Sequence, residues 1–75
     1  MNTEKGESII ELKKYYEKRV RITDVNNVTF EGMVNDYFYP DDNISGKESI
    51  VIDTIDGRVI EFYQTDISRI SIIED

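Results

Sequence analysis

The chain is 75 residues long, enough for one small domain but too short for a deep catalytic cleft of its own. It has no cysteine and no histidine, so it lacks thiolate metal ligands, disulfides and the usual general base. Sixteen acidic residues against nine basic ones give a net charge of −7, which opposes nonspecific binding to a phosphate backbone. We therefore expect a protein that is not an enzyme, holds no cofactor or metal, and has no small-molecule substrate.

The N-terminal segment, residues 1–7, is polar and without periodicity, so we expect it to be disordered. The remainder, residues 8–75, is expected to form a single domain. The sequence contains neither a signal-type apolar segment nor an apolar run of membrane-spanning length. These features predict a cytoplasmic protein that does not contact a membrane.

An α-helix is predicted over residues 9–17. Ser8 and Glu11 have the spacing of a capping box, in which each side chain satisfies a backbone N–H of the first turn. A helix this short is marginal alone and should dock on the rest of the domain. The docking face is expected to hold three residues at helical spacing: Ile9, Leu12 and Tyr16.

From residue 19 the apolar period changes to two, which predicts a strand over 19–23, a turn at 24–27 and a second strand from Val28. Paired residues share one face of a sheet, so an odd-length loop is expected. The predicted pairs are Ile22 with Val28, and Val20 with Phe30. Gly32 lies inside the second strand, where glycine typically marks a bend, a bulge or a close backbone approach.

Residues 49–63 form two alternating, β-branched strands joined at Asp56-Gly57, a strong hairpin signal. A two-residue loop would mix apolar and charged side chains on one face, whereas a three-residue loop, residues 55–57, does not. Gly57 should then adopt the left-handed conformation that closes the turn. The predicted pairs are Ile52 with Ile60, and Ile50 with Phe62.

The remaining segments are a long loop, a single turn and a last strand. Residues 37–47 hold the only proline and many turn formers, so we expect a loop there. Residues 64–66 are predicted to form one 3₁₀ turn, followed by a strand over 67–73. Many short strands in a small chain favour closure into a barrel, which removes exposed edges.

Four segments resemble a bacterial Sm-like (LSM-type) small β-barrel: residues 20–24, 30–34, 58–62 and 66–73. The resemblance implies a mainly β fold, a five-stranded, strongly bent, antiparallel SH3-type (Sm-like) barrel with an N-terminal α-helix. Phe30 and Gly32 match the aromatic and the glycine of the family's first motif, where glycine permits the strand to bend. With the turn residue Gly57, they are the residues expected to determine the fold.

The same resemblance implies a mode of assembly and a possible ligand. The family commonly forms rings in which the fourth strand of one subunit pairs with the fifth strand of the next, and many members bind RNA. The corresponding edges here are residues 58–63 and 68–73. After Ile60 the chain reads Glu-Phe-Tyr-Gln-Thr-Asp, without the arginine–glycine pair of the RNA-binding members. No RNA-contacting residue is therefore carried over.

A local basic cluster is the candidate RNA-binding site. Basic groups interleaved with Tyr15 and Tyr16 fit single-stranded nucleic acid, where cations follow the phosphates and aromatic rings stack on bases. The simpler interpretation is a solvated helix face with outward-facing strand arginines, and the net charge favours it. The cluster consists of Lys13, Lys14, Lys18, Arg19 and Arg21.

Three tyrosines are candidates for a protein interface, since tyrosine is enriched in such contacts: Tyr37, Tyr39 and Tyr63. An acidic loop beside them would suit a basic partner. Alternatively, the rings cover an open barrel end and the docked helix. We expect the protein to be a non-catalytic interaction module, for protein–protein contact or self-assembly, with RNA binding through the basic cluster as the alternative.

Overall fold

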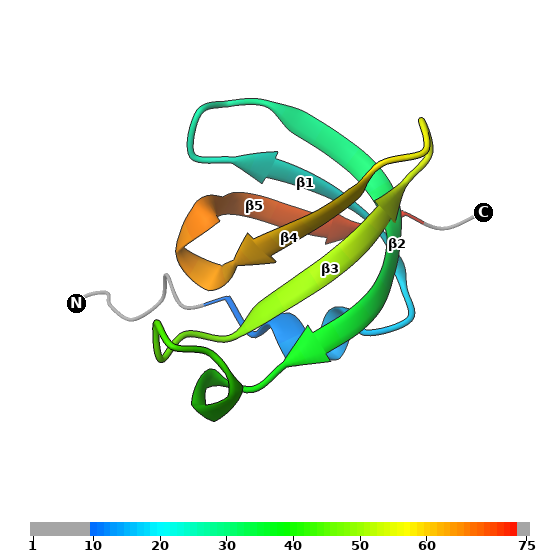
Figure 1. Ribbon diagram of the computed structural model, residues 1–75. Helices are drawn as coiled ribbons and strands as arrows, with labels where there is room; N and C mark the ends of the chain where they lie inside the picture. The colour runs from blue at the N-terminus through cyan, green and yellow to red at the C-terminus, as the bar shows by residue number, and fades with distance from the viewer. Residues whose placement is uncertain (1–9, 74–75) are drawn as a thin grey trace.

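The computed structural model describes residues 10–73, which form one antiparallel sheet of five strands in the order β4-β3-β2-β1-β5 (Figure 1). The strands are β1 (Arg19–Asp24), β2 (Thr29–Phe38), β3 (Ser49–Thr54), β4 (Val59–Tyr63) and β5 (Ile67–Ile72). Three 3₁₀ segments accompany them: η1 (Leu12–Tyr15), η2 (Pro40–Asp42) and η3 (Gln64–Asp66). The mainly β, five-stranded antiparallel prediction is confirmed. The predicted strongly bent, closed barrel is not, because β4 and β5 end the strand order and the sheet stays open.

The predicted α-helix over residues 9–17 is wrong: of the described residues 10–17, only Leu12–Tyr15 are helical, and they form the 3₁₀ segment η1. In a 3₁₀ helix residues three apart lie above one another, so Leu12 and Tyr15 are buried while Tyr16 is exposed. The helix cannot continue because Glu17 takes a φ of +62° and its N–H donates to the Val34 carbonyl, 2.9 Å away. Pairing with β2 therefore replaces the last helical turn. The predicted cap at Ser8, the docking residue Ile9 and the disordered segment 1–7 lie outside the described residues.

The first hairpin has the expected odd-length loop but a different register. Ile22 pairs with Phe30 rather than Val28, a shift of two residues that keeps every side chain on its predicted face. The reason is Asp24, whose carboxylate accepts the N–H groups of Asn26 and Val28, each at 2.9 Å. This Asx-type turn lengthens β1 by one pair and confines the loop to residues 25–27.

The second hairpin is confirmed in register and in turn length. Ile52 pairs with Ile60 and Ile50 with Phe62, as the three-residue loop predicts. Gly57 has a φ of +92°, a conformation that side chains other than that of glycine rarely adopt. The predicted turn at Gln64–Asp66 is also present, as η3.

Strand β2 is the centre of the sheet and pairs with β1 through its first half and with β3 through its second. It runs without a break through Gly32, and the register shift lies instead between Val34 and Asp36. It also continues to Phe38, so the predicted loop over 37–47 begins two residues later than expected. Gly32 allows the β3 backbone to approach β2 closely, since an added β-carbon would overlap the carbonyl oxygen of Asp53.

The core lies on one face of the sheet, and η1 packs against β2 and β3 on that side (Figure 1). Phe30 meets Phe62 edge to face, with 5.1 Å between ring centroids, and so joins β2 to β4. No helix within residues 10–73 is long and apolar enough to cross a membrane. The buried apolar side chains are Leu12, Tyr15, Val20, Ile22, Val34, Ile50, Ile52, Phe62 and Ile67.

Candidate functional site

The predicted basic cluster is exposed, but its side chains engage different neighbours. Arg21 Nε lies 2.7 Å from a carboxylate oxygen of Glu31, its cross-strand partner on β2. The Lys14 ammonium is 5.4 Å from the centre of the Tyr15 ring. Lys13 and Lys14 lie on η1, Arg19 and Arg21 lie on β1, and Lys18 lies between these elements. The RNA-binding role of the cluster stays a prediction.

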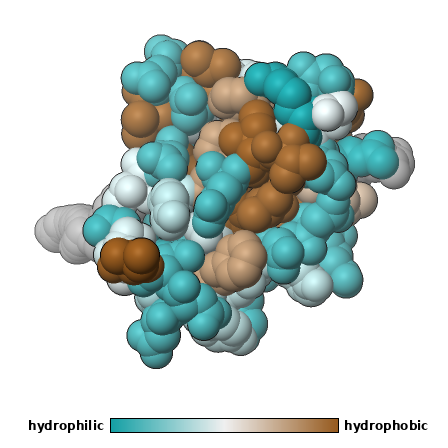
Figure 2. All heavy atoms as spheres, viewed as in Figure 1, coloured by the Kyte–Doolittle hydropathy of each residue, from teal (hydrophilic) through white to brown (hydrophobic). Residues whose placement is uncertain are grey.

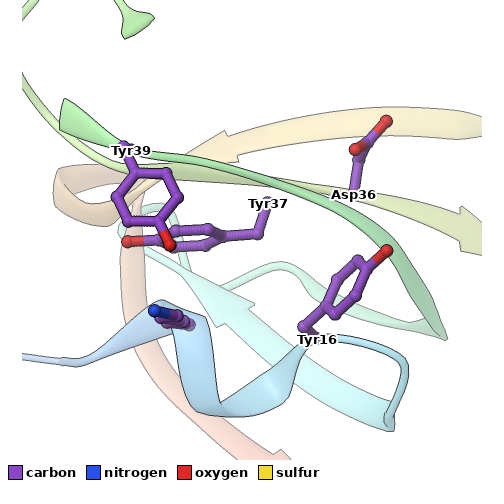
Figure 3. Close-up of a pocket in the computed structure, with 5 residues that line it drawn as sticks. Tyr16, Asp36, Tyr37 and Tyr39 are labelled. Atoms are coloured by element: carbon purple, nitrogen blue, oxygen red, sulfur yellow. The ribbon is translucent and has the colours of Figure 1, made fainter. Parts of the chain in front are cut away.

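A cleft of about 300 Å³ lies between η1 and the end of β2, and we call it the tyrosine cleft. Its lining residues are Lys13, Tyr16, Asp36, Tyr37 and Tyr39. Figure 3 shows the three aromatic rings around this opening, with Asp36 directed away from them. The cleft thus combines one member of the predicted basic cluster with two of the predicted interface tyrosines.

The contacts within the tyrosine cleft fix its shape. Tyr37 and Tyr39 meet edge to face with 5.1 Å between centroids, and the Lys13 ammonium lies 5.1 Å from the Tyr39 ring centre. The neighbouring Tyr39 side chain raises the pKa of Lys13 above its usual value. The Tyr37 hydroxyl donates to Glu48 at 2.7 Å. The pKa of Tyr37 is raised to about 12, mainly by burial of the hydroxyl and secondly by this hydrogen bond to Glu48.

The third predicted interface tyrosine lies elsewhere. Tyr63 ends β4 opposite Ser49, and its N–H donates to the Asp66 carboxylate at 3.0 Å. It does not line the tyrosine cleft. Tyr16, in contrast, does line the cleft, although its helical spacing predicted a docked position. That spacing misled because the segment is a 3₁₀ turn, in which Tyr15 rather than Tyr16 follows Leu12 into the core.

The edges predicted for assembly are the two ends of the sheet. Residues 58–63 contain β4 and residues 68–73 contain most of β5, and neither strand has a second neighbour within the described chain. Val59 on β4 is 71% exposed and Ile72 on β5 is 44% exposed. Figure 2 shows hydrophobic side chains gathered where β4 crosses in front of β1 and β5 in this view. Each free edge therefore exposes an apolar side chain, beside charged ones such as Glu61 on β4 and Arg69 on β5.

A second open cleft, of about 500 Å³, lies beside the β5 edge. It is lined on one side by the segment around η1 and on the other by Ser68, Arg69 and Ile70 of β5. The Gln64 side chain donates to the Ile10 carbonyl at 2.6 Å and holds the start of the described chain at this place. We call this opening the β5 cleft.

Comparison with family models, with curated proteins and with solved structures gives no match for this chain.

Proposed function

We propose that this protein is a non-catalytic interaction module of Sm-like type that associates with copies of itself through the free edges of its sheet. The Sm-like assignment rests on the sequence resemblance and is supported by the order of elements. A short helical segment precedes four consecutive antiparallel strands, the one-turn η3 follows, and β5 returns to pair with β1. At the mid-strand glycine of the resemblance, Gly32, an added β-carbon would overlap the neighbouring backbone of β3.

The observation that carries the proposal is the pair of free edges on a small open sheet. An edge strand presents unpaired N–H and C=O groups, and proteins that avoid association usually blunt such edges with charge, proline or a covering segment. Here β5, of sequence Ile-Ser-Arg-Ile-Ser-Ile, carries one charged side chain and no proline. Each backbone hydrogen bond formed with a second chain contributes about 1 kcal/mol. Burial of apolar side chains at the edge adds to this.

RNA binding is less well supported by the geometry. Arg21 is engaged with Glu31, and Lys13 lies on the Tyr39 ring. A net charge of −7 adds long-range repulsion of phosphate. RNA binding therefore remains the second candidate function, after self-association.

Size-exclusion chromatography with light scattering, over a wide range of protein concentration and with or without oligo-U or oligo-A RNA, tests both candidates. Self-association predicts a mass that rises with concentration and slow amide exchange along β4 or β5. A strict monomer at high concentration, with rapid exchange at both edges, contradicts it. RNA binding predicts a complex at low salt that Lys14→Glu or Arg19→Glu weakens.

A further inference from the structure

The free edge of β5 offers the backbone groups of Ile70 and Ile72. The Ile73 N–H donates to the Arg19 carbonyl at 2.9 Å, which makes these two residues a hydrogen-bonded pair of the β1–β5 ladder. Such pairs alternate along an antiparallel ladder, so residues 71 and 69 also point their backbone groups at β1. Residues 70 and 72 then point theirs outward. Their side chains share the core face, because they stand opposite Ile22 and Val20.

The free edge of β4 has the opposite arrangement. The Thr54 N–H donates to the Arg58 carbonyl at 2.8 Å, so even-numbered residues of β4 bond to β3. The backbone groups of Val59 and Glu61 therefore point outward, and their side chains lie on the face away from the core. At β5, the residues whose backbone groups point outward have their side chains on the core face. At β4, the residues whose backbone groups point outward have their side chains on the opposite face.

This difference restricts which edges can meet. In an antiparallel pair, residues that exchange hydrogen bonds lie opposite each other and share a face. Pairing β4 with β5 of a second copy in this way would place Glu61 on the same face as Ile70 or Ile72. When a strand pairs with the same strand of a second copy, the core faces of the two sheets lie on the same side. For β5 this sets isoleucine against isoleucine, and for β4 it sets Glu61 against Val59.

We propose that two copies of the chain pair antiparallel through β5 about a two-fold axis at Ser71, so that Ile70 of each copy lies opposite Ile72 of the other. This inference rests on the proposed self-association and names its edge and register. Four backbone hydrogen bonds join the copies in this register, two for each isoleucine pair. The core faces of both sheets become one continuous surface.

Charge and space both favour this register. Arg69 is the one charged residue of β5, and it lies opposite Ile73 of the second copy, well away from the other Arg69. On β4, in contrast, Glu61 is exposed, and the Asp66 carboxylate already holds the Tyr63 N–H. The β5 cleft, which Ile70 lines, leaves room beside the edge for side chains of the incoming strand.

Cysteine cross-linking tests the register, and the cysteine-free sequence gives a clean background. Opposed residues of a non-hydrogen-bonded pair have Cα atoms about 4.5 Å apart, within the range that a disulfide spans. Ser71→Cys should therefore form a disulfide dimer rapidly under mild oxidation. Ser68→Cys, at the other exposed serine of the strand, is the matched control, because its counterpart in the second copy lies about 20 Å away at ~3.3 Å per residue.

A second pair of variants tests the edge without cysteine. Ile72→Glu places a carboxylate opposite Ile70 of the other copy and should weaken the dimer at least tenfold by light scattering. Val59→Glu, at the more exposed position on β4, should leave the dimer intact. Both residues are substantially exposed in the single chain, so both variants should fold, which circular dichroism and thermal unfolding check.

The outcomes separate the register from the proposed function. Rapid Ser71→Cys cross-linking with dissociation by Ile72→Glu supports the β5 dimer. An associating protein in which a mixture of Glu61→Cys and Ser71→Cys gives chiefly the mixed disulfide overturns it and leaves self-association standing. Dissociation by Val59→Glu but not by Ile72→Glu would likewise overturn the β5 dimer and leave self-association standing. A monomer at every concentration, with no excess of Ser71→Cys over Ser68→Cys dimers, overturns both.

Discussion

Gly32 on β2 and Asp53 on β3 approach so closely that a β-carbon on Gly32 would overlap the carbonyl oxygen of Asp53. The obstructing atom belongs to the backbone, so it cannot rotate away as the end of a flexible side chain would. Gly32→Ala must therefore displace β3 or break a pair of the ladder. We expect the variant to lose about 1–3 kcal/mol of the free energy of unfolding, as for overpacked sites, measured by urea denaturation.

Gly46→Ala is the control for Gly32→Ala. Gly46 has a φ of +75°, but an added β-carbon there meets open space. Its alanine variant should lose only about 1 kcal/mol, from the left-handed backbone alone. Equal losses at the two positions would contradict steric crowding at Gly32.

Leu12 is fully buried although it lies in a helical segment of only four residues. Truncating it leaves a cavity between η1 and the sheet, which the surrounding structure fills only in part. Leu12→Ala should cost about 2–4 kcal/mol of the free energy of unfolding. Tyr16→Ala, at the 44% exposed position that helical spacing assigned to the core, should cost less than about 1 kcal/mol. If Tyr16→Ala cost more stability than Leu12→Ala, the predicted α-helical docking face would be supported instead.

Tyr37 should titrate late in the folded protein, with a pKa of about 12 against an ordinary value of 10.0. Because the folded-state pKa is raised, its contribution to stability is complete below pH 10 and is lost as pH rises through 12. Ultraviolet titration of tyrosinate should show a late phase that Tyr37→Phe removes and Glu48→Gln shifts to lower pH. Tyr39→Phe, which keeps the Tyr37–Glu48 hydrogen bond, should retain a late phase. Uniform titration of all tyrosines near pH 10 would contradict this.

Asp56 should stabilise the β3–β4 turn at neutral pH and not in acid. Hydrogen bonds from Thr54, and then from Arg58, lower the pKa of Asp56 below its usual 3.8. A lowered folded-state pKa contributes stability that is present above 3.8 and is lost as pH falls through the folded value. Asp56→Asn should therefore be less stable than the wild type at pH 7, and the difference should shrink toward pH 2.

Thr54→Val is the companion to Asp56→Asn, since it removes the hydroxyl that donates to Asp56 but keeps the side-chain volume. In Thr54→Val, the free energy of unfolding should therefore fall less than in the wild type as the pH is lowered from 7 to 2. Thermal unfolding at a series of pH values measures both variants. A constant difference between Asp56→Asn and the wild type from pH 7 to pH 2 would exclude the linkage.

The strands were predictable because their information is local and repeats with period two. Parity alone gives odd loops in both hairpins, and Gly57 fixes the register of the second. The register of the first depends on the side chain of Asp24, which accepts two backbone N–H groups and so moves the turn. Nothing in the apolar pattern encodes that choice.

The helix and the barrel were mispredicted because tertiary contacts decide them. A capping box favours an α-helix locally, but Glu17 instead pairs with Val34 and ends the helical segment after one turn. Barrel closure requires β4 and β5 to meet, which the apolar pattern of each strand does not determine. Of the candidate site, the shared face of Tyr37 and Tyr39 was predictable from parity, whereas their meeting with Lys13 depends on how η1 packs.

The hydrogen bond from Gln64 to the Ile10 carbonyl has a practical consequence for anyone preparing the protein. It fastens the start of the described chain beside β5, at the edge where we place a second copy. A tag at the C-terminus follows the same strand in sequence, two residues after Ile73. Oligomeric state is therefore best measured after cleavage of any tag, since an appended peptide can occupy the strand position that a second molecule would take.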